Sequence, residues 1–115
     1  MFKPYELRVC HDTGDGSVHL EVHGEVDTMV APQLLDSVLC AAMSYDHHNI
    51  VVDLSGCTFM DSSGLAALIA AHCRLVDDRS HLVITNAPPM VARIMELAGL
   101  DSVLDIRPRW MSASL

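Results

Sequence analysis

The chain has 115 residues, of which 50% are hydrophobic and 4% aromatic, and its 15 acidic and 7 basic residues give a formal net charge of −8. This composition predicts one domain over residues 1–115 with an aliphatic core, and it argues against nucleic-acid binding because the negative charge would repel a phosphate backbone. No apolar run approaches the roughly 18 residues that a membrane span requires, so we expect no membrane insertion and a protein partner with a basic surface.

The cysteines favour a reducing compartment. They are irregularly spaced, form no Cys-x-x-Cys pair, and comprise Cys10, Cys40, Cys57 and Cys73. The first residues also lack the long apolar stretch of a signal peptide. We therefore expect a cytoplasmic protein with reduced, mostly buried thiols and no disulfide bond.

The first two elements in chain order are predicted strands. Polar and apolar residues alternate over 6–10 and 17–23, and the segment 11–16 between them is rich in glycine and aspartate, which predicts a β-hairpin. Gly24-Glu25-Val26-Asp27 then breaks the alternation and leads to Thr28, which we expect to cap the next helix.

The rest of the chain alternates between helical and strand patterns. The run Ile50-Val51-Val52-Asp53-Leu54 is short, nearly continuously apolar and rich in β-branched residues, which predicts a strand buried on both faces. The Met and Leu residues of the last helix are expected in the core, with Gly99 just past its end. Helical spacing and further apolar runs predict the remaining helices over 29–42, 65–76 and 90–97 and the remaining strands over 81–85 and 103–106.

This order of elements, ββαβαβα with a short final strand, predicts an α/β fold in which helices pack on a mixed sheet of four to five strands. We expect the core to span about 6–107 and residues 108–115 to form a surface tail. The strands over 17–23, 50–54 and 81–85 should be parallel, so the loops that follow them should gather at one edge of the sheet. Open α/β sheets place their functional sites at that edge.

The loop with the most chemistry at this edge is Asp61-Ser62-Ser63-Gly64. Asp61 and Ser62 are both good N-cap residues, so a helix begins here, and its unpaired N–H groups make a natural seat for a phosphate. By themselves, Ser62, Asp61 and Asp27 are more often capping residues than reactive groups. Gly64 costs about 1 kcal/mol relative to alanine in a first helical turn, and the close approach of another backbone would explain it.

The residues around this turn resemble a known family. The segment from Val51 to Leu65, VVDLSGCTFMDSSGL, is similar to the signature of the STAS domain and, within that family, to bacterial anti-sigma factor antagonists. Gly24-Glu25-Val26-Asp27 resembles a second family element, and the resemblance covers roughly residues 6–107. It implies that Ser62 is a phospho-acceptor. It also implies a partner surface made of Asp27, Asp61, Ser62, Ser63 and Gly64. Within this surface, Asp61 would orient the loop.

The resemblance implies the function of an anti-sigma factor antagonist. The unphosphorylated form would bind an anti-sigma factor that is itself a serine kinase with a GHKL-type ATP site, and would thereby release a sigma factor for transcription. Phosphorylation of Ser62 would end the binding, and a serine phosphatase is a further implied partner. The ATP would be bound by the partner kinase, so we expect no cofactor in the chain itself.

Two other functions are compatible with these residues. One is a STAS subunit of another assembly, such as a stressosome or a transporter-ATPase regulator, and the other is a small nucleotide- or ligand-binding module that uses the same helix N-terminus. We do not expect an enzyme, because the chain has neither the Gly-x-Ser-x-Gly nucleophile elbow nor a glycine-rich P-loop.

A metal site is also not expected. The adjacent pairs His47-His48 and His72-Cys73 point apart on regular structure, and His19 and His23 fall on the outer face of a predicted strand, where solvation is the ordinary explanation. We expect His72 to be a satisfied histidine in the core or at its boundary.

Overall fold

The computed structural model describes residues 6–10, 17–45 and 49–107. The hairpin turn at 11–16 and the tail at 108–115, both predicted above, lie outside the described residues. The elements follow the predicted order: β1 (Glu6–Cys10), β2 (Ser17–Val26), α1 (Ala31–Tyr45), β3 (Asn49–Met60), α2 (Ser62–Asp77), β4 (His81–Thr85), α3 (Pro89–Leu97), the short 3-10 helix η1 (Leu100–Ser102) and β5 (Asp105–Arg107).

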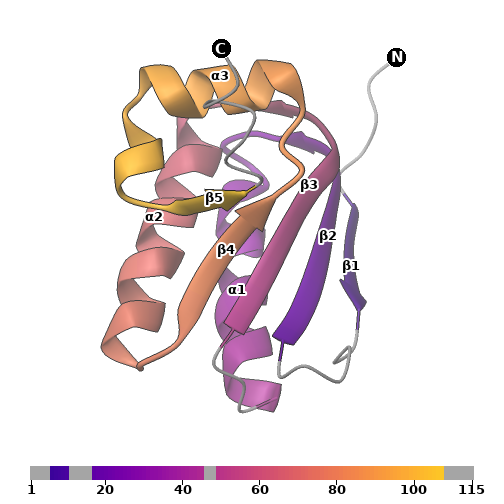
Figure 1. The fold of residues 1–115 in the computed structure, drawn as a ribbon. Coiled ribbons are helices and arrows are strands. Elements are labelled where there is room, and N and C mark those ends of the chain that lie inside the picture. The colour runs from indigo at the N-terminus through magenta and orange to yellow at the C-terminus, as the bar shows by residue number, and fades with distance from the viewer. Residues whose placement is uncertain (1–5, 11–16, 46–48, 108–115) are drawn as a thin grey trace.

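The strands form one mixed sheet (Figure 1). Its order is β1-β2-β3-β4-β5, with β1 antiparallel to β2 and each later pair of neighbours parallel. The predicted hairpin and the predicted α/β fold are confirmed, and the sheet has five strands. Because β2, β3 and β4 are parallel, their carboxyl ends share one edge, as expected.

The helices α1 and α2 pack side by side on one face of this sheet, and α3 crosses the end at which β3 finishes (Figure 1). The prediction that the strand around 50–54 is buried on both faces is wrong. Its alternate residues Val51 and Asp53 point to the uncovered face and are only half-buried. The core lies between the sheet and the helices and includes Val18, Leu20, Val22, Ile50, Val52, Leu54, Leu68 and Leu75, all fully buried.

Both central strands are longer than their sequence patterns predict. β2 continues through Gly24 to Val26, so the expected break after residue 23 is wrong, and β3 continues to Met60 where a loop was expected after residue 54. The two extensions pair with each other across two register shifts and end with Val26 opposite Met60. Gly24 has a φ of 90°, a conformation that suits glycine and accommodates such a shift.

The central helix α2 buries a narrower stripe than predicted. Leu65, Leu68 and Leu75 are buried, but Val76, in the last turn of the helix, is exposed. His72 is half-buried, and its Nδ1 atom is buried without a hydrogen-bond partner among the described residues. The expected position at the boundary of the core is confirmed, but the expectation that the histidine is satisfied is wrong for Nδ1.

The last helix has one covered side only. Val91 and Met95 are buried, whereas Met90 and Leu97 are exposed, so the expectation that its Met and Leu residues belong to the core is wrong for these two. Gly99 follows the helix with a φ of 76°, which confirms the predicted helix end.

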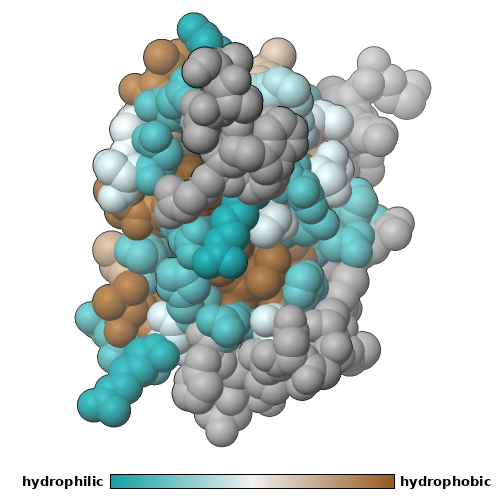
Figure 2. Space-filling view, viewed as in Figure 1, coloured by the Kyte–Doolittle hydropathy of each residue, from teal (hydrophilic) through white to brown (hydrophobic). Residues whose placement is uncertain are grey.

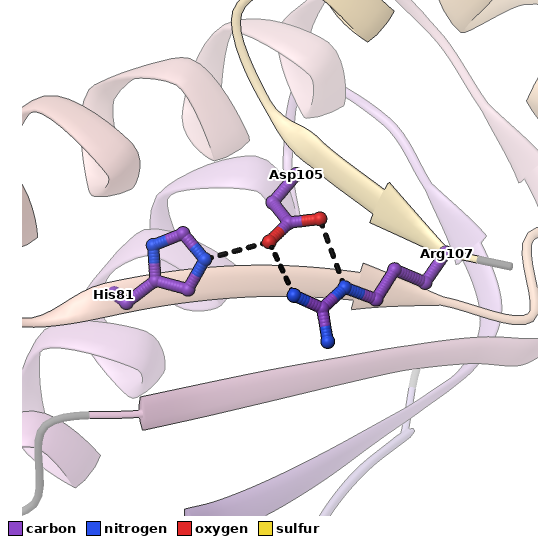
Figure 3. A network of polar contacts seen from close by, with 3 residues as sticks. All are labelled: His81, Asp105 and Arg107. Atoms are coloured by element: carbon purple, nitrogen blue, oxygen red, sulfur yellow. Dashed lines mark hydrogen bonds and ion pairs between the residues drawn. The ribbon is translucent and has the colours of Figure 1, made fainter. Parts of the chain in front are cut away.

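A network of polar side chains joins the short edge strand β5 to β4 (Figure 3). Arg107 donates from Nε to Oδ1 of Asp105 (3.0 Å) and from Nη2 to Oδ2 (2.9 Å), and Nε2 of His81 lies 2.7 Å from the same Oδ2. Burial of Asp105 opposes its ionisation, but the hydrogen bonds and charges of Arg107 and His81 outweigh burial and lower the pKa of this carboxyl.

We expect Asp105→Asn to reduce the free energy of unfolding by about 1 kcal/mol at neutral pH. The substitution removes the charge-assisted, bidentate contact with Arg107 and the contact with His81, and the effect is modest because both partners are about half exposed. A carboxyl with a lowered pKa in the folded state stabilises the fold above its unfolded pKa, about 3.9, and loses that contribution as pH falls through the folded value. Urea unfolding of both proteins should therefore show a difference that is full at about pH 5 and shrinks below about pH 4. A difference that persists in acid would contradict the charge-based explanation.

The described cysteine side chains, Cys40, Cys57 and Cys73, are free thiols, in agreement with the prediction of no disulfide, and the Cys10 side chain lies outside the description. Cys57 is buried at the helix-covered face of β3, and burial raises the pKa of its thiol. Cys40 and Cys73 are exposed, so the expectation of mostly buried thiols is wrong for these two. They lie on the outer sides of α1 and α2.

We expect iodoacetamide to alkylate Cys40 and Cys73 in the folded protein at least about tenfold faster than Cys57, because the thiolate is the reactive form and Cys57 is both buried and harder to ionise. Peptide mapping by mass spectrometry measures the three rates at neutral pH. The difference should vanish in concentrated urea, and fast labelling of Cys57 in the folded protein would contradict its burial.

Candidate functional site

The loops that follow β2 and β3 meet at the carboxyl edge of the sheet. Val26 and Met60 form the last pair of the two strands, and the N–H of Asp61 donates to the carbonyl of Val26 at 3.2 Å. Asp27 and Asp61 therefore follow directly from neighbouring strand ends. The prediction that Asp27 and Ser62 share one edge of the sheet is confirmed.

Asp61 caps helix α2. Its backbone is extended, and its Oδ1 accepts hydrogen bonds from the N–H groups of Ser63 (2.9 Å) and Gly64 (3.3 Å). These are the donors that the sequence offered as a seat for a phosphate. Because a carboxylate already fills them, the expected seat is not open in this structure.

Asp27 plays the same part in the loop before α1. Its Oδ1 accepts from the N–H groups of Met29 (3.0 Å) and Val30 (3.2 Å), and its carbonyl accepts from Val30 and Ala31. The prediction that Thr28 caps this helix is wrong, because Asp27 accepts from these donors and the Thr28 hydroxyl pairs with Ser63 instead. The helix itself begins at Ala31, two residues later than predicted.

The two serines of the turn differ in their surroundings. Ser62 is the first residue of α2, is exposed, and has a hydroxyl that bonds to no other described residue. Ser63 is half-buried, and its Oγ lies 3.0 Å from Oγ1 of Thr28. The sequence pattern did not identify Thr28 as its partner. The sequence feature that could have indicated this contact is the position of Thr28 directly after Asp27, which places a second hydroxyl at the same edge of the sheet.

Gly64 lies beneath this surface and is buried. A Cβ atom at this position would lie 2.5 Å from Cγ of Met60 and 3.0 Å from Cγ1 of Val26. Other atoms do approach Gly64 closely, as expected, but they belong to the side chains of Met60 and Val26 and not to another backbone. Gly64 thus lets the first turn of α2 sit directly on the ends of β2 and β3.

Exposed apolar side chains accompany these polar groups at the same edge. Met29, in the loop after β2, is 81% exposed, and Phe59 near the end of β3 and Met90 in the first turn of α3 are also exposed. Figure 2 shows polar and apolar residues interspersed over the face of the sheet that the helices leave uncovered. Large exposed methionines are typical of surfaces that contact other proteins.

Among the described residues, no three His, Cys, Asp or Glu side chains are grouped so that they could hold a metal ion. Within the same ranges, no helix has the length and apolar character needed to cross a membrane. The absence of a metal site remains a prediction.

This architecture defines a class: a small α/β domain that presents two helix-capping aspartates and an exposed serine at the carboxyl edge of a parallel strand pair. A family model described as "Mlab, STAS domain" matches residues 11–107, and the chain belongs to the STAS domain family. The predicted family is confirmed.

Curated relatives and solved structures carry names of regulatory proteins. The anti-sigma-B factor antagonist of Staphylococcus epidermidis is 26% identical over 94 residues, which is 82% of this chain and 86% of the relative. The crystal structure of an anti-sigma factor antagonist from Mycobacterium paratuberculosis matches with a TM-score of 0.77 and 26% identity, covering 98% of this chain and 95% of that one. The Bacillus protein SpoIIAA in its phosphorylated form shares the fold, with a TM-score of 0.64, 17% identity and coverage of 96% and 97%.

Proposed function

We propose that this chain is an anti-sigma factor antagonist whose partner is an anti-sigma factor with serine kinase activity of the GHKL type. The unphosphorylated chain binds that partner and so releases a sigma factor. The kinase transfers phosphate to Ser62, which ends the binding, and a serine phosphatase restores it. The observation that carries the proposal is the exposed hydroxyl of Ser62, which has no partner among the described residues, at the capped start of α2.

The proposed binding surface combines charge with exposed apolar groups. Asp27, Asp61, Ser62 and Ser63 lie at the carboxyl edge of β2 and β3, and buried Gly64 supports them from beneath. The two carboxylates, on a chain of net charge −8, favour a partner with a basic surface. Met29 supplies an adaptable apolar contact next to Asp27.

The geometry also supplies the physical basis for a switch. A phosphate on Ser62 adds a charge of about −1.5 to −2 beside the carboxylate of Asp61. The N–H groups of Ser63 and Gly64 cannot compensate it, because Asp61 already uses them. The basic groups of the partner are already matched to the carboxylates of Asp27 and Asp61. The added phosphate would therefore be buried without a cation of its own, which costs several kcal/mol, and the partner dissociates.

The occupied helix N-terminus weighs against the rival function of a small nucleotide- or ligand-binding module. An anion at this position would have to displace the Asp61 carboxylate from both of its donors. A STAS subunit of another assembly is the remaining alternative, and the identity of the partner distinguishes it.

To test the proposal, the chain is incubated with ATP and each of a set of purified GHKL-type anti-sigma factor kinases. Mass spectrometry then maps the phosphorylated residue, and calorimetry measures binding. We expect one kinase to form a complex and to place phosphate on Ser62. Met29→Glu should weaken that complex at least about tenfold, whereas Met43→Glu, at an equally exposed (82%) position of α1, should leave it unchanged.

Other outcomes would contradict the proposal. Capture of a transporter ATPase or a stressosome subunit in place of a kinase would assign the chain to another branch of the family. A rise in the melting temperature on adding nucleotides alone would favour the ligand-binding module, since a ligand of the folded state must stabilise it.

A further inference from the structure

A pair of hydroxyl groups joins the two loops of the site. Oγ1 of Thr28, in the loop after β2, lies 3.0 Å from Oγ of Ser63 in the first turn of α2, and 35 positions separate them in the chain. This is the one side-chain hydrogen bond between these loops among the described residues. Ser62, one position earlier, has a hydroxyl without any such bond.

This difference bears on which serine can accept a phosphate. An accepting hydroxyl must turn a lone pair toward phosphorus and pass its proton to a base. The Ser63 hydroxyl is hydrogen-bonded to Thr28 and its side chain is half-buried, so that contact restricts how the hydroxyl can turn toward phosphorus. The Ser62 hydroxyl is exposed and needs no such rearrangement.

We propose that Thr28 is a positioning residue that restricts phosphorylation to Ser62 by holding the hydroxyl of Ser63. This proposal rests on the proposed function. In the reaction, Oγ of Ser62 attacks the γ-phosphorus of the ATP bound by the kinase. An O–P bond forms, the bond to the ADP leaving group breaks, and the hydroxyl proton passes to a general base of the kinase. Thr28 takes part in none of these bonds and acts through Ser63 alone.

The test compares Thr28→Val, which has nearly the same shape without the hydroxyl, with Thr28→Ser, which keeps the hydroxyl. The probe is a purified GHKL-type kinase that phosphorylates the parent chain, with ATP. We expect the share of phosphate on Ser63 to rise at least about tenfold in Thr28→Val, and Thr28→Ser to behave like the parent. In the Ser62→Ala background, adding Thr28→Val should create phosphorylation at Ser63. A purely structural role of Thr28 would not move this site ratio.

A second measurement needs no kinase. Exchange of the backbone amides at positions 63 and 64, followed by NMR, should become several-fold faster in Thr28→Val and in Ser63→Ala than in the parent. The double variant should exchange no faster than either single variant. Additive changes would overturn the hydroxyl pair, and unchanged phosphorylation at Ser63 in Thr28→Val would overturn its role in selecting the acceptor. If no kinase phosphorylates the parent chain, both the proposed function and the role of Thr28 in acceptor selection are overturned. If the parent is phosphorylated at Ser62 but the exchange effects of the two single variants add up in the double variant, only the role of Thr28 is overturned.

Discussion

Ser62→Ala should bind the partner kinase constitutively, and Ser62→Asp should bind it at least about 100-fold more weakly, while both variants unfold within about 0.5 kcal/mol of the parent. The stability should change little because Ser62 is exposed and its hydroxyl bonds to no described residue, and because Asp61, not Ser62, caps the helix. Urea unfolding and calorimetric titration with the kinase measure the two quantities separately.

Ser62→Asp should weaken binding without destabilising the fold, because position 62 belongs both to the start of α2 and to the proposed interface. A negative charge in the first turn of α2 suits the helix dipole, so the fold tolerates it. The same charge at an interface must be desolvated next to Asp61, whose carboxylate lies at the same helix start. Stability and affinity should therefore separate.

Ser63→Ala is the matched control for these variants, because it removes the neighbouring hydroxyl and leaves Ser62 in place. It should still be phosphorylated at Ser62. If Ser62→Ala accepts phosphate as fast as the parent, or Ser62→Asp binds as tightly, Ser62 is not the switch.

Gly64→Val should reduce the free energy of unfolding by about 2–4 kcal/mol, the second large effect that we expect. The first added carbon alone would lie 2.5 Å from Met60 and 3.0 Å from Val26, and both of these side chains are buried and cannot move into solvent. Relief requires α2 to shift away from the strand ends. The partner affinity should fall with it, because the same shift moves Ser62 relative to Asp27.

Ala66→Val is the control, since position 66 is exposed on the same helix and reports only the lower helix propensity of valine, about 0.5 kcal/mol. Urea unfolding of both variants gives the comparison. An equal, small loss in the two would mean that the contacts at Gly64 adapt freely and that its role beneath the site is wrong.

Local patterns in the sequence determined much of this protein. Alternation predicted the hairpin, helical spacing predicted α1, α2 and α3, and the order of elements predicted the parallel strands that bring Asp27 and Ser62 to one edge. The Asp61 cap was also predictable, because a cap depends on residues only two or three positions apart. The motif around Ser62 was enough to indicate the family.

The tertiary structure decided what depends on residues far apart in the chain. The polar pattern after residue 54 gives no sign of a strand, and β3 reaches Met60 because β2 offers it a pairing partner across two register shifts. Helix spacing alone does not say which side a neighbour covers, so the exposure of Met90 and Leu97 followed only from the packing of α3. The contact between Thr28 and Ser63 joins residues 35 positions apart, and only the folding of both loops onto one sheet edge brings these hydroxyls within hydrogen-bond distance.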